Sequence, residues 1–123
     1  KVYLDRQREM DYQISRAGWT GDYPDPNTFL DMWTSWSQQN QTGWADPKYD
    51  ALIRKAAITK DPNARLEVFQ EAEEILMDQL PIIPIYIYTR VYALHPAVKN
   101  WHANVLDHHP WKHIDLDLSL LKK

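Results

Sequence analysis

The chain has 123 residues, enough for one small domain, and its 44% hydrophobic and 25% charged residues are those of an ordinary globular protein. A formal charge of −3 lacks the basic excess typical of proteins that bind nucleic acid, and no nucleic acid partner is expected. The absence of cysteine excludes a disulfide framework and a thiolate metal site. Aromatic residues make up 12%, including six Trp, which suits a recognition surface as well as a core.

The first 26 residues predict a strand that runs into a turn. Residues 1–10 are highly charged, and their pattern leaves open a helix end or a solvated approach to a strand. The segment 12–17 has the period-2 pattern of a strand with two different faces, in which Tyr12, Ile14 and Arg16 alternate with Gln13, Ser15 and Ala17. Residues 18–26, rich in Gly, Pro and Asp, predict a turn. Asp22 is therefore predicted just past a strand end, where open α/β sheets tend to bind ligands.

A short helix is predicted next. Asn27 or Thr28 is a candidate N-cap for a helix through Ser37, with its aromatic side chains in the core. The polar run 38–43 predicts a surface loop, and Trp44 is predicted to anchor its end.

Two Asp-Pro pairs, at residues 46–47 and 61–62, predict a helical hairpin. Asp suits an N-cap and Pro suits the first helical position. The apolar residues after each pair recur at the spacing of one buried helix face. They are Tyr49, Leu52, Ile53 and Ala56 in the first helix, and Leu66, Phe69, Ala72, Leu76 and Leu80 in the second.

The C-terminal part predicts a buried strand and a closing strand. Residues 80–88 are nearly all β-branched or aromatic apart from Pro81 and Pro84, which are confined to the entrance of the predicted strand. From residue 99 the pattern is that of an irregular polar tail, and alternation over 114–120 predicts one half-buried strand. The predicted fold class is α/β, with a sheet that further chain or a second copy must complete.

Enzymatic and metal-binding interpretations are weaker. Four histidines in the tail, at positions 102, 108, 109 and 113, suggest a metal site, but no pair has His-x3-His spacing on a convincing helix, and His109 precedes Pro110. Asp22, Asp25 and Asp31 are candidate acids of a glycosidase, but a Pro-rich turn separates them. No Ser-His-Asp or P-loop pattern is present. We therefore expect a non-enzyme, without catalytic residues, metal or cofactor.

Three motifs carry a family resemblance. They are RAGWTGDYPDPNTFLDMW at 16–33, NQTGWADPKYDALI at 40–53 and LPIIPIYIYTR at 80–90. In this order they resemble the C-terminal part of the peptide-binding proteins of ABC transporters, over about residues 12–101. Members of that family are several times longer, and we expect this chain to be a fragment of such a protein.

The resemblance implies part of one lobe of a type II periplasmic-binding-protein fold, whose two lobes close on the ligand. Residues 1–101 are expected to form a portion of the C-terminal ligand-binding lobe. Residues 102–123 are expected to return to the other lobe as a tail with a closing strand. Without the N-terminal part of the same polypeptide, this chain is expected to bind ligand poorly. It is also expected to self-associate through the faces that the missing part would cover.

The resemblance also implies a function: a component of an ABC importer that captures short peptides and delivers them to the permease. The location implied is the periplasm, or the outer face of the cytoplasmic membrane as a lipoprotein. Asp22 corresponds to the family's clamp for the peptide α-amino group, and Arg16 to a position that reaches the terminal carboxylate in some relatives. The complete implied ligand-binding set is Asp22, Trp19, Thr20, Gly21, Tyr23 and Arg16.

Two alternatives remain open within this fold. One is a regulatory module that senses a ligand instead of feeding a transporter. The other is a binder of an oligosaccharide, a nickel complex or haem.

Overall fold

The computed structural model describes residues 1–104 and 106–121. It consists of two compact units, Lys1–Pro84 and Ile85–Lys123. Val105 and the last two residues of the predicted tail lie outside the described residues.

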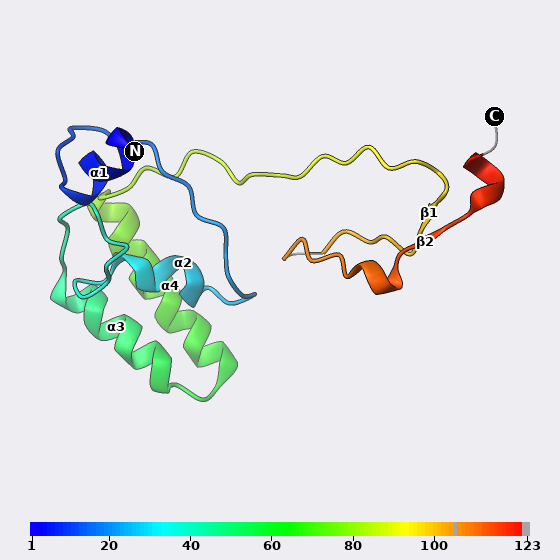
Figure 1. Cartoon of the computed structure of the whole chain (residues 1–123). Helices are drawn as coiled ribbons and strands as arrows, with labels where there is room; N and C mark the ends of the chain where they lie inside the picture. The colour runs from blue at the N-terminus through cyan, green and yellow to red at the C-terminus, as the bar shows by residue number, and fades with distance from the viewer. Residues whose placement is uncertain (105, 122–123) are drawn as a thin grey trace. The chain divides into compact units, whose positions relative to one another are not determined.

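The first unit is helical. It contains α1 (Val2–Arg8), α2 (Asn27–Leu30), the 3₁₀ helix η1 (Asp31–Trp33), α3 (Pro47–Ile58) and α4 (Pro62–Gln79). Helices α3 and α4 lie side by side as a hairpin, and α2 contacts α4 (Figure 1). The charged N-terminal stretch, which the sequence left undecided, is the helix α1.

Both predicted Asp caps are confirmed. Asp46 Oδ1 accepts hydrogen bonds from the backbone N–H groups of Lys48 at 2.8 Å and Tyr49 at 2.9 Å. Asp61 Oδ1 accepts from the N–H of Ala64 at 2.8 Å. These bonds satisfy backbone donors that have no partner inside the helix, so each helix begins where the sequence predicted.

The core is formed by the facing sides of the hairpin. The predicted stripe on α3 is buried throughout, and Phe69, Ala72 and Leu76 are buried on α4. Leu66 and Leu80, however, were predicted to be buried and are 52% and 56% exposed.

The two errors on α4 have geometric causes. Val68 is buried in place of Leu66. Ala72 lies at the centre of the buried stripe, and Leu66 lies about 120° around the helix axis from it. Leu80 follows the last helical residue in a left-handed conformation, φ 48° and ψ 47°, so the helical periodicity no longer places its side chain.

The predicted helix through Ser37 is too long, and its predicted cap is wrong. Helix α2 and η1 end at Thr34, which is extended. The N-cap residue is Pro26, which makes no side-chain cap bond, and Asp25 Oδ1 accepts a hydrogen bond from the backbone N–H of Asn27 at 2.9 Å just before the helix. The N–H and hydroxyl of Ser35 donate to the buried carboxylate of Asp50, at 3.0 and 2.5 Å. Since that N–H is committed to α3, it is not available to continue the helix.

The following loop is fixed by side chains. The Asn40 amide donates to the carbonyls of Trp33, Thr34 and Trp44, at 3.1, 3.3 and 2.9 Å. Trp44 anchors the loop end as predicted: its Nε1 donates to Gln79 Oε1 at 2.7 Å, and its ring contacts the edge of Tyr49.

The strands predicted over residues 12–17 and 82–88 are not formed within the described part of the chain. Ile83, Ile85 and Ile87 are 76%, 83% and 91% exposed, so the prediction of a buried strand is wrong here. A strand is stabilised by the ladder to a neighbouring strand, and the described residues place none beside either segment.

The second unit contains a short antiparallel pair. Strand β1 (Val98–Lys99) pairs with β2 (Asp115–Leu116), with Val98 opposite Leu116. The predicted closing strand over 114–120 is therefore confirmed only at Asp115 and Leu116, near its start. The 3₁₀ helices η2 (Trp111–His113) and η3 (Leu118–Leu121) lie on either side of β2.

The histidine tail is less exposed than predicted at one position. His109 stacks on Trp101 with ring centroids 4.3 Å apart, and its Nε2 lies 2.8 Å from Asp107 Oδ1. Arg90 Nε lies 2.9 Å from Asp107 Oδ2.

Among residues 1–104 and 106–121, no group of three or more His, Asp or Glu side chains is arranged to hold a metal. In the same residues, no helix has both the length and the apolar character needed to cross a membrane.

The orientation of α4, with Val68 buried and Leu66 exposed, is testable with two truncations. Val68→Ala removes buried methyl groups and should lower the free energy of unfolding by about 2 kcal/mol. The larger truncation Leu66→Ala should cost less than about 1 kcal/mol, because that side chain already contacts solvent. Urea unfolding followed by circular dichroism measures both, and a greater loss for Leu66→Ala would contradict the observed helix orientation.

Candidate ligand-binding site

The Gly-Pro-Asp turn packs against the start of α2. The backbone N–H of Asp22 donates to the hydroxyl of Thr28 at 3.0 Å, and Thr28 is buried. A β-carbon at Gly21 would lie 3.0 Å from the Phe29 ring and 3.1 Å from the Thr28 methyl group. The turn approaches the helix this closely because position 21 has no side chain.

The turn is also bound to α4 by an ion pair. Arg65 Nη1 lies 2.5 Å from Asp25 Oδ2, and Nη2 lies 2.9 Å from Oδ1. Arg65 Nε donates to the carbonyl of Ala56 at 3.2 Å, which joins the same guanidinium to α3. The Arg65 hydrogen bonds hold the pKa of Asp25 below its usual value. A carboxylate stabilised in this way is a poor proton donor, which argues against the glycosidase interpretation of Asp25.

Polar groups gather where the turn meets α2. Asn27 Nδ2 donates to the hydroxyl oxygen of Tyr23 at 3.0 Å and to Asp31 Oδ2 at 2.9 Å. Burial raises the pKa of Asp31, the Asn27 hydrogen bond opposes this, and the negative charge of Asp22 adds to the rise. Asp22 itself is exposed and Tyr23 is 42% exposed. This arrangement offers carboxylate and phenol oxygens to a ligand that carries a cationic or hydrogen-bonding group.

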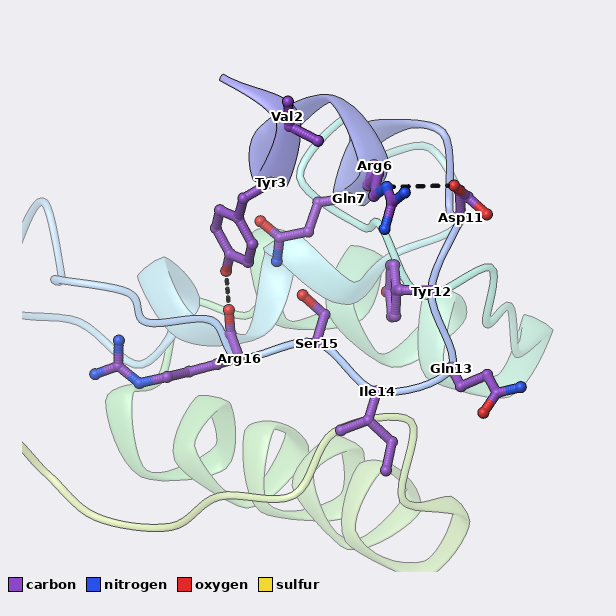
Figure 2. Close-up of a pocket in the computed structure, with 10 residues that line it drawn as sticks. All are labelled: Val2, Tyr3, Arg6, Gln7, Asp11, Tyr12, Gln13, Ile14, Ser15 and Arg16. Carbon is purple, nitrogen blue, oxygen red and sulfur yellow. Dashed lines mark hydrogen bonds and ion pairs between the residues drawn. The ribbon is translucent and has the colours of Figure 1, made fainter.

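Of the remaining predicted site residues, Trp19 and Thr20 lie exposed at the start of the turn and Arg16 lies before it. Trp19 is 38% exposed, and residues 17–20 belong to no helix or strand. The Arg16 carbonyl accepts a hydrogen bond from the Tyr3 hydroxyl (Figure 2).

Arg16 also lines a hollow of about 680 Å³ between α1 and the following segment. Gln7 and Ser15 point toward each other across this hollow, and the Arg16 side chain extends away from them (Figure 2). Asp22, Trp19 and Tyr23 do not line it. The structure thus joins Asp22 and Tyr23 to α2, and places Arg16 beside α1.

The sequence did not assign Asn27, Asp31 or Arg65 to a ligand-binding site. Asn27 was predicted only as a helix-cap candidate, Asp31 only as a candidate acid, and no role was predicted for Arg65. The Asn27 contacts follow helical spacing, since Tyr23 and Asp31 are each four residues away. The Arg65–Asp25 pair spans 40 residues and has no local signal.

Comparison with known proteins identifies the class. The chain is 36% identical over 94% of its length to the dipeptide-binding protein DppE of Bacillus subtilis. It is 36% identical over 85% of its length to the periplasmic murein peptide-binding protein MppA of Escherichia coli. The crystal structure of Haemophilus influenzae OppA in complex with the peptide RPPGFSPFR matches 94% of the chain with a TM-score of 0.81 and 30% identity. No protein-family model matches.

The fold is that of the type II periplasmic-binding proteins that bind peptides. Within it, the chain is homologous to a segment of the oligopeptide- and dipeptide-binding proteins, so the predicted family is confirmed. The chain spans about a fifth of their length: 20% of DppE, 19% of MppA and 23% of the OppA chain. These homologues are binding proteins by name, and several are periplasmic.

The Arg65–Asp25 pair predicts a pH-dependent contribution to stability. Because the folded-state pKa of Asp25 is lowered, the pair stabilises the fold above the unfolded value of about 3.9 and loses its effect as the pH falls through the folded pKa. Asp25→Asn should therefore cost about 1 kcal/mol near pH 7. At about pH 3 the difference from wild type should be smaller.

The measurement is urea unfolding of both proteins at the two pH values. Asp78→Asn, an exposed position on α4, is the matched control and should match wild type at both. An Asp25→Asn difference that is the same at both pH values would contradict the proposed ionic contribution.

Proposed function

We propose that this chain forms part of a receptor that captures short peptides outside the cytoplasmic membrane and delivers them to an ABC permease. The carrying observation is an exposed carboxylate, Asp22, whose backbone is bound to buried Thr28, in a chain homologous to peptide-binding proteins. The peptide complex of OppA, which is similar to 94% of this chain, supports the ligand class.

Asp22 is proposed to clamp the peptide α-amino group. A carboxylate that accepts from an ammonium group forms a charge-assisted hydrogen bond, which is stronger than one between neutral groups. The clamp is orientated because the Asp22 N–H is held by Thr28 and the turn by the Arg65–Asp25 pair. Main-chain flexibility at Asp22 is thus reduced before the ligand arrives.

The backbone of Trp19, Thr20 and Gly21 is proposed to pair with the main chain of the peptide. This mode of recognition adds the ligand as a strand, so that affinity is nearly independent of side-chain identity. Within the described residues the backbone of 18–20 belongs to no ladder, which is consistent with pairing to a ligand. Trp19 is proposed to form one wall of a pocket for a peptide side chain. Tyr23 is proposed to contact the ligand beside Asp22. Arg16 is proposed to bind the terminal carboxylate of the peptide.

The chain is proposed to work within a longer, two-lobed polypeptide, because its relatives are about five times longer. Residues 1–101 are proposed as a portion of the ligand-binding lobe and 102–123 as the return to the other lobe. In isolation the chain would bind peptide weakly and associate through exposed apolar residues such as those of 83–91. A periplasmic location or lipoprotein anchoring on the outer face of the membrane suits this activity, and a non-enzymatic function follows from it.

The test is native mass spectrometry of the complete gene product that contains this chain, purified without denaturation. Wild type should carry a series of short peptides. Asp22→Asn preserves size but removes the charge, and should reduce affinity for trialanine roughly tenfold or more in calorimetry.

Asp78→Asn is the matched control and should leave the bound peptides unchanged, since it lies exposed at the end of α4. A co-purified sugar, nickel complex or haem would reject the peptide assignment in favour of a non-peptide binder. A fused DNA-binding domain in the gene product would favour the regulatory alternative.

A further inference from the structure

The hydrogen-bond chain from Asp31 through Asn27 to Tyr23 bears on ligand recognition. Asn27 is the first residue of α2, and its side-chain amide contacts two oxygens, the Tyr23 hydroxyl and Asp31 Oδ2, at 3.0 and 2.9 Å. Which group donates and which accepts in these two hydrogen bonds follows from the chemistry of the Asp31 carboxylate and the Asn27 amide.

Asp31 determines how the Asn27 amide is orientated. An ionised carboxylate only accepts hydrogen bonds, so the amide atom beside it must be the NH₂ group. The same NH₂ group also contacts the Tyr23 oxygen, and it has two hydrogens, one for each partner. The Tyr23 hydroxyl is therefore the acceptor in its bond with Asn27.

A phenol oxygen that accepts this bond keeps its own hydrogen for another partner. Among residues 1–104 and 106–121, the Tyr23 hydroxyl donates to no acceptor. Tyr23 is 42% exposed, its bond with Asn27 is exposed, and it directly follows Asp22 in the chain, so its O–H is open to a ligand from solvent.

We infer that Asn27 and Asp31 are positioning residues that commit the Tyr23 hydroxyl to donate its hydrogen bond to a carbonyl oxygen of the bound peptide. This inference rests on the proposed peptide-binding function and deepens it. Asp22 accepts from the ammonium group and Tyr23 donates to a carbonyl, so the two neighbouring residues read groups of opposite polarity. A ligand with only donors at this point would satisfy Asp22 and leave Tyr23 without a partner.

The test is a double-mutant cycle in the complete gene product that contains this chain, with trialanine affinity measured by calorimetry. Tyr23→Phe removes the hydroxyl and should weaken binding roughly two- to tenfold. Asn27→Ala leaves the hydroxyl without its donor partner and should weaken binding by a smaller factor. In the Tyr23→Phe background, Asn27→Ala should have no further effect, because the hydroxyl on which it acts is gone.

Folding is separable from positioning. Asn27→Ala retains the backbone N–H that donates to Asp25 Oδ1 at the start of α2, so the variant is expected to fold. Asn63→Ala, an exposed Asn in the first turn of α4, is the matched control and should bind like wild type. Thermal unfolding of each variant shows whether an affinity change reflects lost structure.

Two results would overturn the inference while leaving the proposed function intact: equal losses from Asn27→Ala with and without the Tyr23 hydroxyl, or no loss in either background. If instead wild type does not bind trialanine, or Asp22→Asn binds as well as wild type, the peptide clamp itself is rejected. The Asp22 measurement and the Asn27–Tyr23 coupling thus report separately on the two proposals.

Discussion

The candidate site depends on one bidentate ion pair. Arg65 holds Asp25 of the turn with two short bonds and also donates to the end of α3, so one guanidinium joins the turn to both helices of the hairpin. A second link crosses the core, where the buried Tyr49 hydroxyl donates to the Leu30 carbonyl at 2.6 Å. Burial raises the pKa of Tyr49, so it remains a neutral donor. Both links begin on the hairpin and end just after the predicted ligand contacts in the chain, at Asp25 and Leu30.

The helical hairpin could be predicted from sequence because its determinants are local. An Asp before a Pro caps a helix through atoms two or three residues away, and 3.6-residue periodicity identifies a buried stripe. The strands over 12–17 and 82–88 could not be predicted in the same way. Alternation indicates a preference for extended backbone, but a ladder needs a partner strand that the described residues do not supply. The exposed isoleucines 83, 85 and 87 are the visible result.

The candidate site was predicted in part. The family motif located Asp22 and its neighbours, and the assignment of these residues remains a prediction. What the motif could not indicate is how the turn is held. The pairing of Arg65 with Asp25 depends on how α4 packs, and the part played by Asn27 depends on the carboxylate of Asp31 at 2.9 Å. Residues that support a site through tertiary contacts leave little trace in a single sequence.

The close packing at Gly21 determines where the turn can accept a larger side chain. Gly21 has the Phe29 ring and the Thr28 methyl group where a β-carbon would be, whereas its neighbour Thr20 is exposed. Variation in pocket size and polarity is therefore accessible at position 20 and closed at position 21. Of these two adjacent residues, position 20 is therefore the one that can accommodate a larger side chain. An engineer who seeks a receptor for a new ligand has the same choice, and should randomise Thr20 while Gly21 is kept.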